Sequence, residues 1–259
     1  MTTQSIGFIG GGRVTKIMLN GWKRANKLPG NIIVTDINQE VLETLKKDFP
    51  AVKTVINDST APAACDVVFI GLHPPVFGEI LQKIKTGVKP TTLIVSLAPK
   101  ISIAKISEGL GGLKNIVRII PNAPSIVNNG YNPVTFSKDI QSDYKQTVRD
   151  LFLPLGELPE VKEDLLEAYA LFTGMGPTYF WFQLYELQEI IRSFGISQKA
   201  VQEGLLKMLN GTVKTMFESE LTPAEVMNLV PVKPLGEEEA AIKGFYQNRL
   251  NALYNKIKS

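Results

Sequence analysis

A run of three glycines near the start of the chain constrains its fold more than any other feature. Residues 10–12 are all glycine, they directly follow the apolar run Ile6–Ile9, and an amphipathic helical pattern begins near Arg13. The next apolar run ends at an acidic residue, Asp36. A strand, a glycine-rich turn, a helix start and a carboxylate about 20 residues further on are typical of a dinucleotide site in a βαβ unit. The sequence therefore predicts that the first half of the chain binds a nicotinamide or flavin cofactor.

Each position of the glycine-rich turn has a physical role in this prediction. Gly10 permits the tight turn, and Gly12 lets the backbone approach a pyrophosphate. The helix that begins with Arg13 and Val14 offers free N–H groups and a partial positive charge to the phosphates. Thr15 occupies the third glycine position, which predicts slightly looser packing of the helix on the strand.

Asp36 bears on the choice between NAD and NADP. A carboxylate at the end of the second strand accepts hydrogen bonds from a ribose 2′-OH and repels a 2′-phosphate. The next residues, Ile37 and Asn38, offer no cation to offset that repulsion, so NAD is favoured. Arg13 leaves the alternative open, because it either swings toward a 2′-phosphate or is an ordinary surface charge.

Composition excludes several other classes of protein. The 259 residues carry a formal net charge of only +3 and no long Lys/Arg block, so we expect no nucleic-acid partner. No apolar run approaches the length of a membrane span, and residues 1–5 lack the pattern of a signal peptide. One histidine and one cysteine exclude the usual zinc ligand sets and any internal disulfide. We therefore expect a cytoplasmic protein without a metal.

The first part of the chain alternates between strand and helix patterns. Apolar, β-branched runs that predict strands lie at 5–10, 31–35, 52–55, 66–72, 92–97, 115–119 and 134–137. Helical patterns lie at 13–27, 38–48, 75–85, 102–109 and 139–153. This alternation predicts an α/β fold, a Rossmann-type doubly wound parallel sheet covered by helices on both faces.

After about residue 159 the pattern changes to helices alone. We expect helices at 163–171, 177–194, 198–218, 223–229 and 237–256. Thr222 and Glu225 form a capping box around a proline at the first helical position. The sequence thus predicts a dinucleotide-binding domain at 1–159 and an all-helical dimerisation and substrate domain at 160–259.

The helix expected at 177–194 is apolar nearly all round, since it carries four consecutive aromatic residues and several leucines. Such a helix has to be buried on every side. A small helical domain hardly buries it alone, so we expect a homodimer or a higher homo-oligomer. The alternative is a central helix in a monomeric bundle.

Further segments in chain order carry a family resemblance. They are the turn at 6–12, Asn57 ahead of Cys-Asp-Val-Val at 65–68, Gly-Leu-His-Pro at 71–74, Val-Ser-Leu-Ala at 95–98, Val-Arg-Ile-Ile-Pro-Asn-Ala-Pro at 117–124 and Thr-Gly-Met-Gly-Pro-Thr-Tyr at 173–179. Together they resemble the motifs of pyrroline-5-carboxylate reductase, the last enzyme of proline synthesis. The resemblance implies an NAD(P)H-dependent reductase that transfers a hydride to the C=N bond of a small cyclic imine carboxylate.

The resemblance also implies roles for residues of the first domain. Asn57 helps to hold the adenosine end of the cofactor, and Ala98 belongs to the cofactor-binding set. Leu72, His73 and Pro74 border the nicotinamide side. His73, the only imidazole in the chain, is a candidate proton donor; alternatively it replaces a family lysine whose backbone matters more.

The stiff turn that contains Asn122 lies between two prolines and is the next candidate. Asn122 either presents an amide to cofactor or substrate, or belongs to a purely structural turn. The two prolines fix the backbone of this turn.

The segment Thr173, Gly174, Met175, Gly176 and Pro177 starts a helix, whose free N–H groups suit a substrate carboxylate. In the resembling family this turn helps to bind that carboxylate. The alternative is a helix start without a ligand. Thr173 keeps a hydroxyl and is, with His73, a candidate catalytic residue.

The chain departs from the family pattern at the substrate end. The family's loop reads Ser-Pro-Gly-Gly-Thr-Thr, whereas residues 230–236 read Val-Pro-Val-Lys-Pro-Leu-Gly. Met175 replaces a serine, and Tyr185 replaces an acidic residue. Lys233 either supplies a charge for a carboxylate or is a solvated loop residue. Two alternatives to the family activity follow: a reductase or dehydrogenase with a different small substrate, and a dinucleotide-binding protein without turnover.

Overall fold

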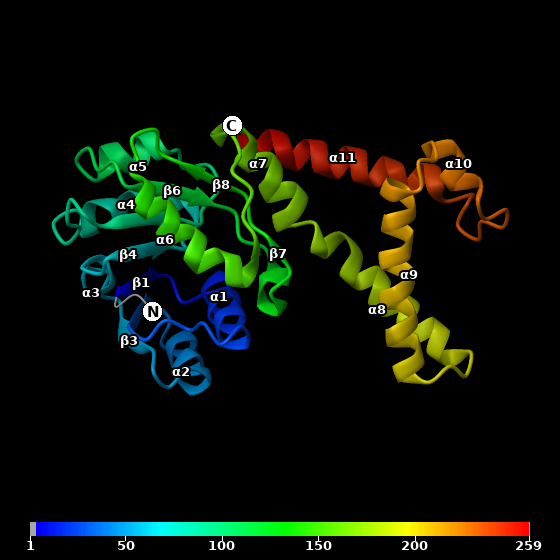
Figure 1. Ribbon diagram of the computed structural model, residues 1–259, viewed down its shortest axis with the longest axis horizontal. Helices are drawn as coiled ribbons and strands as arrows, with labels where there is room; N and C mark the ends of the chain where they lie inside the picture. Colours follow the sequence, from blue (N-terminus) through cyan, green and yellow to red (C-terminus); the bar gives the residue numbers. More distant parts are fainter. Residues whose placement is uncertain (1–3, 259) are drawn as a thin grey trace. The chain divides into compact units, whose positions relative to one another are not determined.

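The apolar runs of the first half form a seven-stranded sheet in the computed structural model, which describes residues 4–258 (Figure 1). The strands are β1 Ile6–Ile9, β2 Ile32–Asp36, β3 Lys53–Ile56, β4 Val67–Ile70, β5 Leu93–Ser96, β6 Ile116–Ile119 and β8 Val134–Phe136. Their order is β3-β2-β1-β4-β5-β6-β8, and all pairs are parallel except β6 with β8. This order confirms the predicted doubly wound fold, because β1 lies between the strand that follows it and β4.

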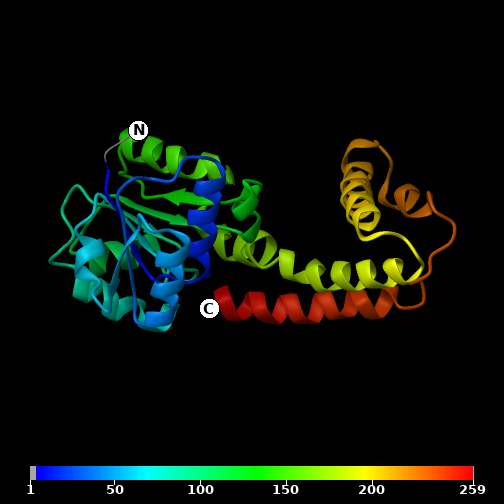
Figure 2. The same cartoon turned by 90° about the horizontal axis from the view of Figure 1, so that it is seen from below.

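Helices cover both faces of the sheet, as the near-continuous apolar strands require. The helices are α1 Arg13–Arg24, α2 Gln39–Asp48, α3 Thr60–Ala63, α4 Pro74–Ile84, α5 Ile103–Gly109 and α6 Ser142–Phe152. The buried side chains of α1, α2 and α6 pack into one hydrophobic cluster, and those of α3, α4 and α5 pack into the other. Figure 2 shows the same layers from below.

Two buried side chains hold α1 against the sheet. Trp22 is fully buried, lies against Phe8 and Phe69, and donates its indole N–H to the Leu151 carbonyl at 2.6 Å. Thr15 is also buried, and its hydroxyl donates to the carbonyl of Gly10 at 2.6 Å. The threonine at the third glycine position thus satisfies its hydroxyl within the turn, and the slightly looser packing expected there stays a prediction.

Some short elements have no counterpart in the sequence patterns. The four-residue helix α3 lies between β3 and β4, and a small second sheet joins β7 Gly130–Tyr131 to β9 Gly156–Glu157. Gly156 has φ +135°, and a Cβ there would lie 2.2 Å from the carbonyl oxygen of Gly130. Only glycine fits this close approach of two backbones.

The contacts divide the chain later than the predicted boundary between residues 159 and 160. One compact unit runs to Met175 and includes the C-terminal residues from Tyr254, and the other comprises Gly176–Leu253. The helix expected at 163–171 is a 3₁₀ turn Glu163–Leu165, the short helix α7 Leu166–Tyr169 and a π-helical turn Ala170–Gly174. This segment stays with the sheet because Arg118 of β6 pairs with two of its glutamates.

The second unit is helical, as predicted. It contains α8 Pro177–Ser193, α9 Gln198–Glu218, α10 Pro223–Asn228 and most of α11 Glu239–Lys258. The capping box of Thr222 and Glu225 is present at the start of α10. The rings of Tyr179 on α8 and Tyr246 on α11 lie edge to face, and away from this contact the two helices diverge (Figure 1).

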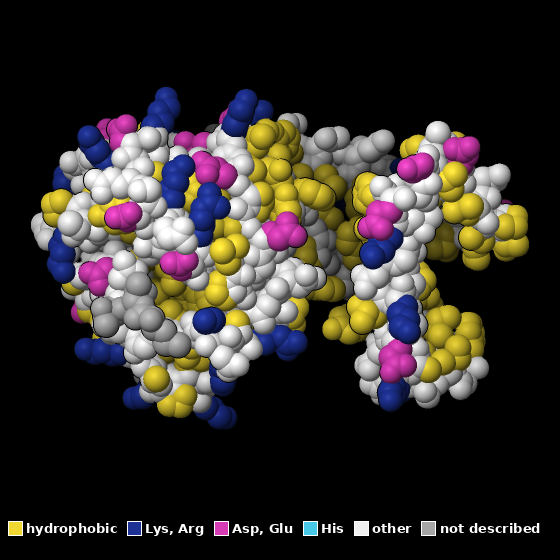
Figure 3. Space-filling view, viewed as in Figure 1, with side chains coloured by type: hydrophobic (Ala, Val, Ile, Leu, Met, Phe, Trp, Pro, Cys, Tyr) yellow, Lys and Arg dark blue, Asp and Glu magenta, His cyan; other side chains and the backbone are white. Residues whose placement is uncertain are grey.

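The helical unit leaves many large apolar side chains exposed. On α8 and α9 they include Phe180, Trp181, Phe182, Tyr185, Ile190, Leu206, Met216 and Phe217. Figure 3 shows apolar side chains gathered over these helices. Within residues 4–258, none of the helices combines the length and the apolar composition that a membrane crossing requires.

Candidate functional site

The predicted cofactor residues gather at the carboxyl edge of the sheet. Because the first six strands are parallel, the segments that follow them all emerge at one edge, where open α/β sheets place their ligands. These segments carry Gly10 and Gly12 after β1, Asp36 at the end of β2, Asn57 after β3, Leu72, His73 and Pro74 after β4, Ala98 after β5 and Asn122 after β6. Arg13 and Val14 open the helix α1.

The glycine-rich turn has the geometry that a pyrophosphate site needs. Gly10 has φ +104°, and a Cβ there would lie 2.7 Å from the carbonyl oxygen of Gly71. At Gly12 an added Cβ would meet no described atom within 4 Å, so this backbone faces open space. Gly10 therefore shapes the turn, and Gly12 leaves room for a ligand at the start of α1.

Backbone N–H groups hold the carboxylate of Asp36 in place. Its Oδ2 accepts a hydrogen bond from the N–H of Gly11 at 2.8 Å, and its Oδ1 accepts one from Asn38 at 2.9 Å. Its backbone carbonyl accepts from the N–H of Asn57 at 2.9 Å, and Asn57 itself has φ +50°. The acid is thus oriented in the protein alone, and its remaining lone pairs can accept from a ribose hydroxyl.

A pocket of about 220 Å³ adjoins Asp36. It is lined by Ile9, Gly10, Thr35, Asp36, Ile37, Asn57, Ser59, Leu72, Val76, Glu79, Ile80 and Lys83. Sequence reasoning missed the four residues from α4, although their spacing of three and four places one face of a helix toward a single surface. The apolar walls and the acid at one end fit the adenosine half of a dinucleotide.

The segment after β4 begins α4, the helix that lines the same pocket. His73 is the N-cap residue of α4, and its side chain is exposed. Pro74 is the first residue of that helix. Ala98, after β5, is buried, and its N–H donates to the hydroxyl of Ser96 at 3.4 Å. Leu72, predicted on the nicotinamide side, lines the pocket with Asp36. The roles of His73, Pro74 and Ala98 in binding stay predictions.

Asn122 takes part in the bonds of its own turn. It is buried, and its Oδ1 accepts from the N–H of Tyr131 at 3.2 Å. Its backbone N–H donates to Oδ1 of Asn132 at 3.1 Å. The observed bonds are those of the structural alternative, and a contact with cofactor or substrate stays a prediction.

The turn that contains Thr173 packs against the end of β6. The hydroxyl of Thr173 donates to the carbonyl of Tyr169 at 3.2 Å, and the N–H of Met175 closes the π-helical turn on Ala170 at 2.9 Å. A Cβ at Gly174 would lie 3.2 Å from Cγ2 of Ile120. The structure thus brings Thr173, Gly174 and Met175 to the strand that leads to Asn122.

The remaining predicted substrate residues, Gly176, Pro177 and Lys233, belong to the helical unit. Lys233 is exposed in the loop between α10 and α11. Their roles in binding stay predictions.

The lone thiol and the acidic groups do not suggest other chemistry. Cys65 is buried, and burial raises the pKa of its thiol, which disfavours the nucleophilic thiolate. Among residues 4–258, no three His, Cys, Asp or Glu side chains gather where they could hold a metal ion.

Comparisons with known proteins find similarity to oxidoreductases. Residues 5–100 match a family model described as NADP oxidoreductase, coenzyme F420-dependent. The pyrroline-5-carboxylate reductase of Corynebacterium melassecola is 28% identical over 258 residues, which cover 98% of this chain and 94% of that protein. The enzyme of the same name from Pseudomonas aeruginosa is 26% identical over 254 residues, covering 98% and 92%.

Solved structures show the same fold. A pyrroline-5-carboxylate reductase from Coxiella burnetii matches with a TM-score of 0.69 at 26% identity, over 99% of this chain and 95% of that one. The pyrroline carboxylate reductase of Plasmodium falciparum, solved with NADP bound, matches with a TM-score of 0.81 over 100% and 98%. Its 23% identity supports the fold alone.

Proposed function

Because the chain belongs to the pyrroline-5-carboxylate reductase family, we propose that it reduces the C=N bond of pyrroline-5-carboxylate, as in proline biosynthesis. It is an NAD(P)-dependent oxidoreductase. The observation that carries the proposal is the carboxyl edge of the sheet, where the open backbone at Gly12 and the oriented Asp36 flank a pocket fit for adenosine.

The residues at this edge divide the work of the reaction. A nicotinamide cofactor held at this edge would supply the hydride that reduces the C=N bond to a C–N bond. The N-terminus of α1 binds the pyrophosphate, and Asp36 fixes the ribose. Thr173 already donates its hydrogen to the carbonyl of Tyr169, so its oxygen can accept a hydrogen bond from the substrate nitrogen once that nitrogen is protonated. The proton that converts the imine to this iminium ahead of hydride transfer comes from His73 or from water.

The altered loop at 230–236 motivates a panel of substrates. We expect oxidation of NADH in the presence of pyrroline-5-carboxylate, and slower oxidation with cyclic imines that lack the carboxylate. Steady-state absorbance at 340 nm measures both. Turnover with another imine or a ketone, but not with pyrroline-5-carboxylate, would favour the alternative of a reductase with a different small substrate. Tight binding of the cofactor with no turnover on any substrate would contradict the proposed enzyme.

We also propose that NADH is preferred over NADPH, on the strength of Asp36. Asp36→Asn removes the negative charge that repels a 2′-phosphate and keeps the size of the side chain. We expect the ratio of kcat/KM for NADPH to kcat/KM for NADH to rise at least about tenfold. Asp150→Asn is the matched control, because Asp150 is exposed on α6, bonds Gln146 of the same helix and does not line the pocket. A wild-type protein that turns over NADPH faster than NADH would contradict this argument.

We propose further that the functional protein is a homodimer. The exposed aromatic residues of α8 support this, because a monomer in water rarely leaves so many large apolar side chains uncovered. A second copy of the helical unit offers the matching apolar surface. The lone cysteine suits the reducing cytoplasm, where we place the reaction.

A further inference from the structure

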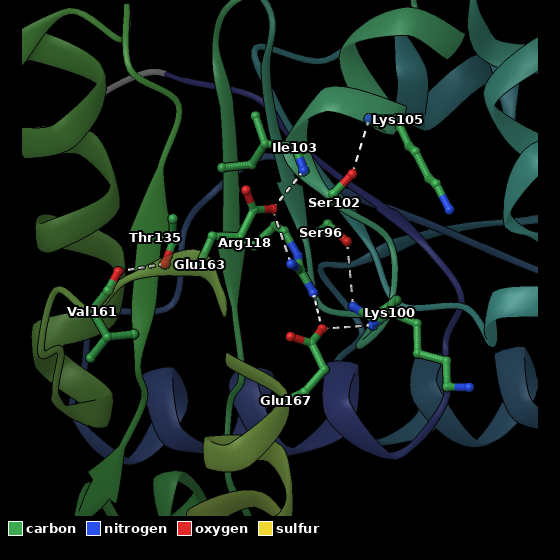
Figure 4. Close-up of polar contacts among 11 residues, drawn as sticks. Ser96, Lys100, Ser102, Ile103, Lys105, Arg118, Thr135, Val161, Glu163 and Glu167 are labelled. Carbon is green, nitrogen blue, oxygen red and sulfur yellow. Dashed lines mark hydrogen bonds and ion pairs between the residues drawn. The ribbon is translucent and has the colours of Figure 1, made fainter. Parts of the chain in front are cut away.

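Arg118 is a buried cation in the middle of the sheet domain. It lies on β6, only 3% of its side chain is exposed, and it forms two ion pairs. Its Nη1 lies 3.0 Å from Glu163 and its Nη2 lies 2.7 Å from Glu167 (Figure 4). Both glutamates belong to the segment that leads to the turn with Thr173.

The same two carboxylates hold a second segment. Oε1 of Glu163 accepts from the backbone N–H of Ile103 at 2.7 Å, and Oε1 of Glu167 accepts from the backbone N–H of Lys100 at 3.0 Å (Figure 4). Lys100 has φ +73°, a conformation that a lysine rarely adopts without support. Arg118 therefore reaches residues 97–103, between β5 and α5, through its two carboxylates.

The charges of this cluster are kept in place. Burial raises the pKa of Glu167, but the hydrogen bonds from Arg118 and Lys100 and the charge of Arg118 outweigh it, so the pKa is lowered. Nε of Arg118 is buried without a hydrogen-bond partner among the residues that the structure describes. A buried ion cluster with an unsatisfied N–H contributes little net stability, because apolar residues of similar volume would stabilise the fold as much. What it does provide is a fixed geometry for the backbone that it binds.

That backbone lies at a place that matters for a nicotinamide cofactor. The two halves of a dinucleotide lie on either side of the switch point next to β1. The pocket with Asp36, which fits the adenosine half, is lined by the ends of β1, β2 and β3 and by Leu72 and α4. The segments after β5 and β6 do not line it, which leaves them for the nicotinamide half. Residues 97–103 follow β5 and include Ala98.

We propose that Arg118, acting through Glu163 and Glu167, is a positioning residue that fixes residues 97–103 against the nicotinamide half of the cofactor. This inference rests on the proposed function, because it requires a nicotinamide dinucleotide at the carboxyl edge of the sheet.

The test compares two ligands that differ in the nicotinamide half. Glu167→Ala removes the acceptor of the Lys100 N–H and leaves Arg118 paired with Glu163. We expect the Kd of NADH to rise at least about tenfold and the Kd of ADP-ribose to change by less than about twofold, since only NADH carries the nicotinamide ring. Isothermal titration calorimetry of the full chain measures both. Glu167→Gln keeps an acceptor for the Lys100 N–H, and we expect it to restore most of the NADH affinity.

Two controls separate positioning from general stability. Glu160→Ala breaks exposed ion pairs with Lys145 and Arg149, and Val148→Ala opens a cavity in the buried face of α6. We expect neither to change the ratio of the two Kd values, even where Val148→Ala lowers Tm as much as Glu167→Ala does.

Each other outcome counts against a stated claim. Equal losses of NADH and ADP-ribose affinity in Glu167→Ala, or no loss of either, would overturn the positioning role and leave the proposed function standing. If Val148→Ala changed the ratio of the NADH Kd to the ADP-ribose Kd as much as Glu167→Ala does, the effect of Glu167→Ala would be one of general stability, and the positioning role would be overturned. A wild-type protein that binds neither ligand would overturn the proposed function itself.

Discussion

Gly10→Ala is expected to abolish saturable cofactor binding and to lower the stability of the protein. The new Cβ would lie 2.7 Å from the carbonyl oxygen of Gly71, and φ at this position is +104°. Either the turn moves away from the pyrophosphate or the strained conformation costs about 1–3 kcal/mol. NADH titration and thermal unfolding measure the two effects on one sample.

Gly12→Ala is the matched comparison for this prediction. Its Cβ meets no described atom within 4 Å in the protein alone, so we expect a Tm close to that of the wild type. We still expect weaker NADH binding, because the methyl group occupies the space through which the backbone approaches the pyrophosphate. A Gly10→Ala protein with wild-type Tm and NADH affinity would contradict the assignment of this turn.

Replacing Trp181 and Phe182 together with glutamate is expected to convert the proposed dimer into a monomer. These neighbouring α8 side chains are 46% and 69% exposed in the single chain. Aromatic residues dominate the binding energy of many interfaces, at about 2 kcal/mol or more each, and buried unpaired charges add a further penalty. We expect the dissociation constant of the dimer to rise at least about a thousandfold, as measured by sedimentation equilibrium.

An exposed ion pair on α9 provides the control for the loss of dimerisation. Lys199→Ala with Glu203→Ala removes an exposed pair on α9 and leaves the apolar surface intact. We expect this variant to remain as dimeric as the wild type. A wild-type protein that sediments as a monomer at micromolar concentrations would contradict the proposed assembly.

The sequence predicted the sheet well because its signals are local. Each strand from β1 to β6 is a short apolar run next to a helical pattern, and the structure places each within about two residues of the expected bounds. The β7–β9 pair was missed because two residues carry no periodic pattern. The helix expected at 163–171 is present as a continuous helical segment, but the changes from 3₁₀ to α to π winding along it were not predicted.

The site residues that directly follow strands were predictable from the sequence. Gly10, Asp36 and Asn57 lie beside the turn because the ends of parallel strands share one edge. The pocket residues of α4 depend on how that helix is rotated over the edge, which no local motif fixes. The Arg118 cluster joins residues 45 and 49 positions apart, so only the folded chain brings its charges together.

The most direct test of the proposed function is the stoichiometry of product and cofactor. The purified protein is mixed with NADH and pyrroline-5-carboxylate, and proline is quantified by mass spectrometry while the absorbance of NADH is followed. The proposed reaction predicts one proline formed for each NADH oxidised, with no NADH oxidation when the imine is left out. NADH that binds tightly but is not oxidised, with no proline formed under any condition, would contradict it.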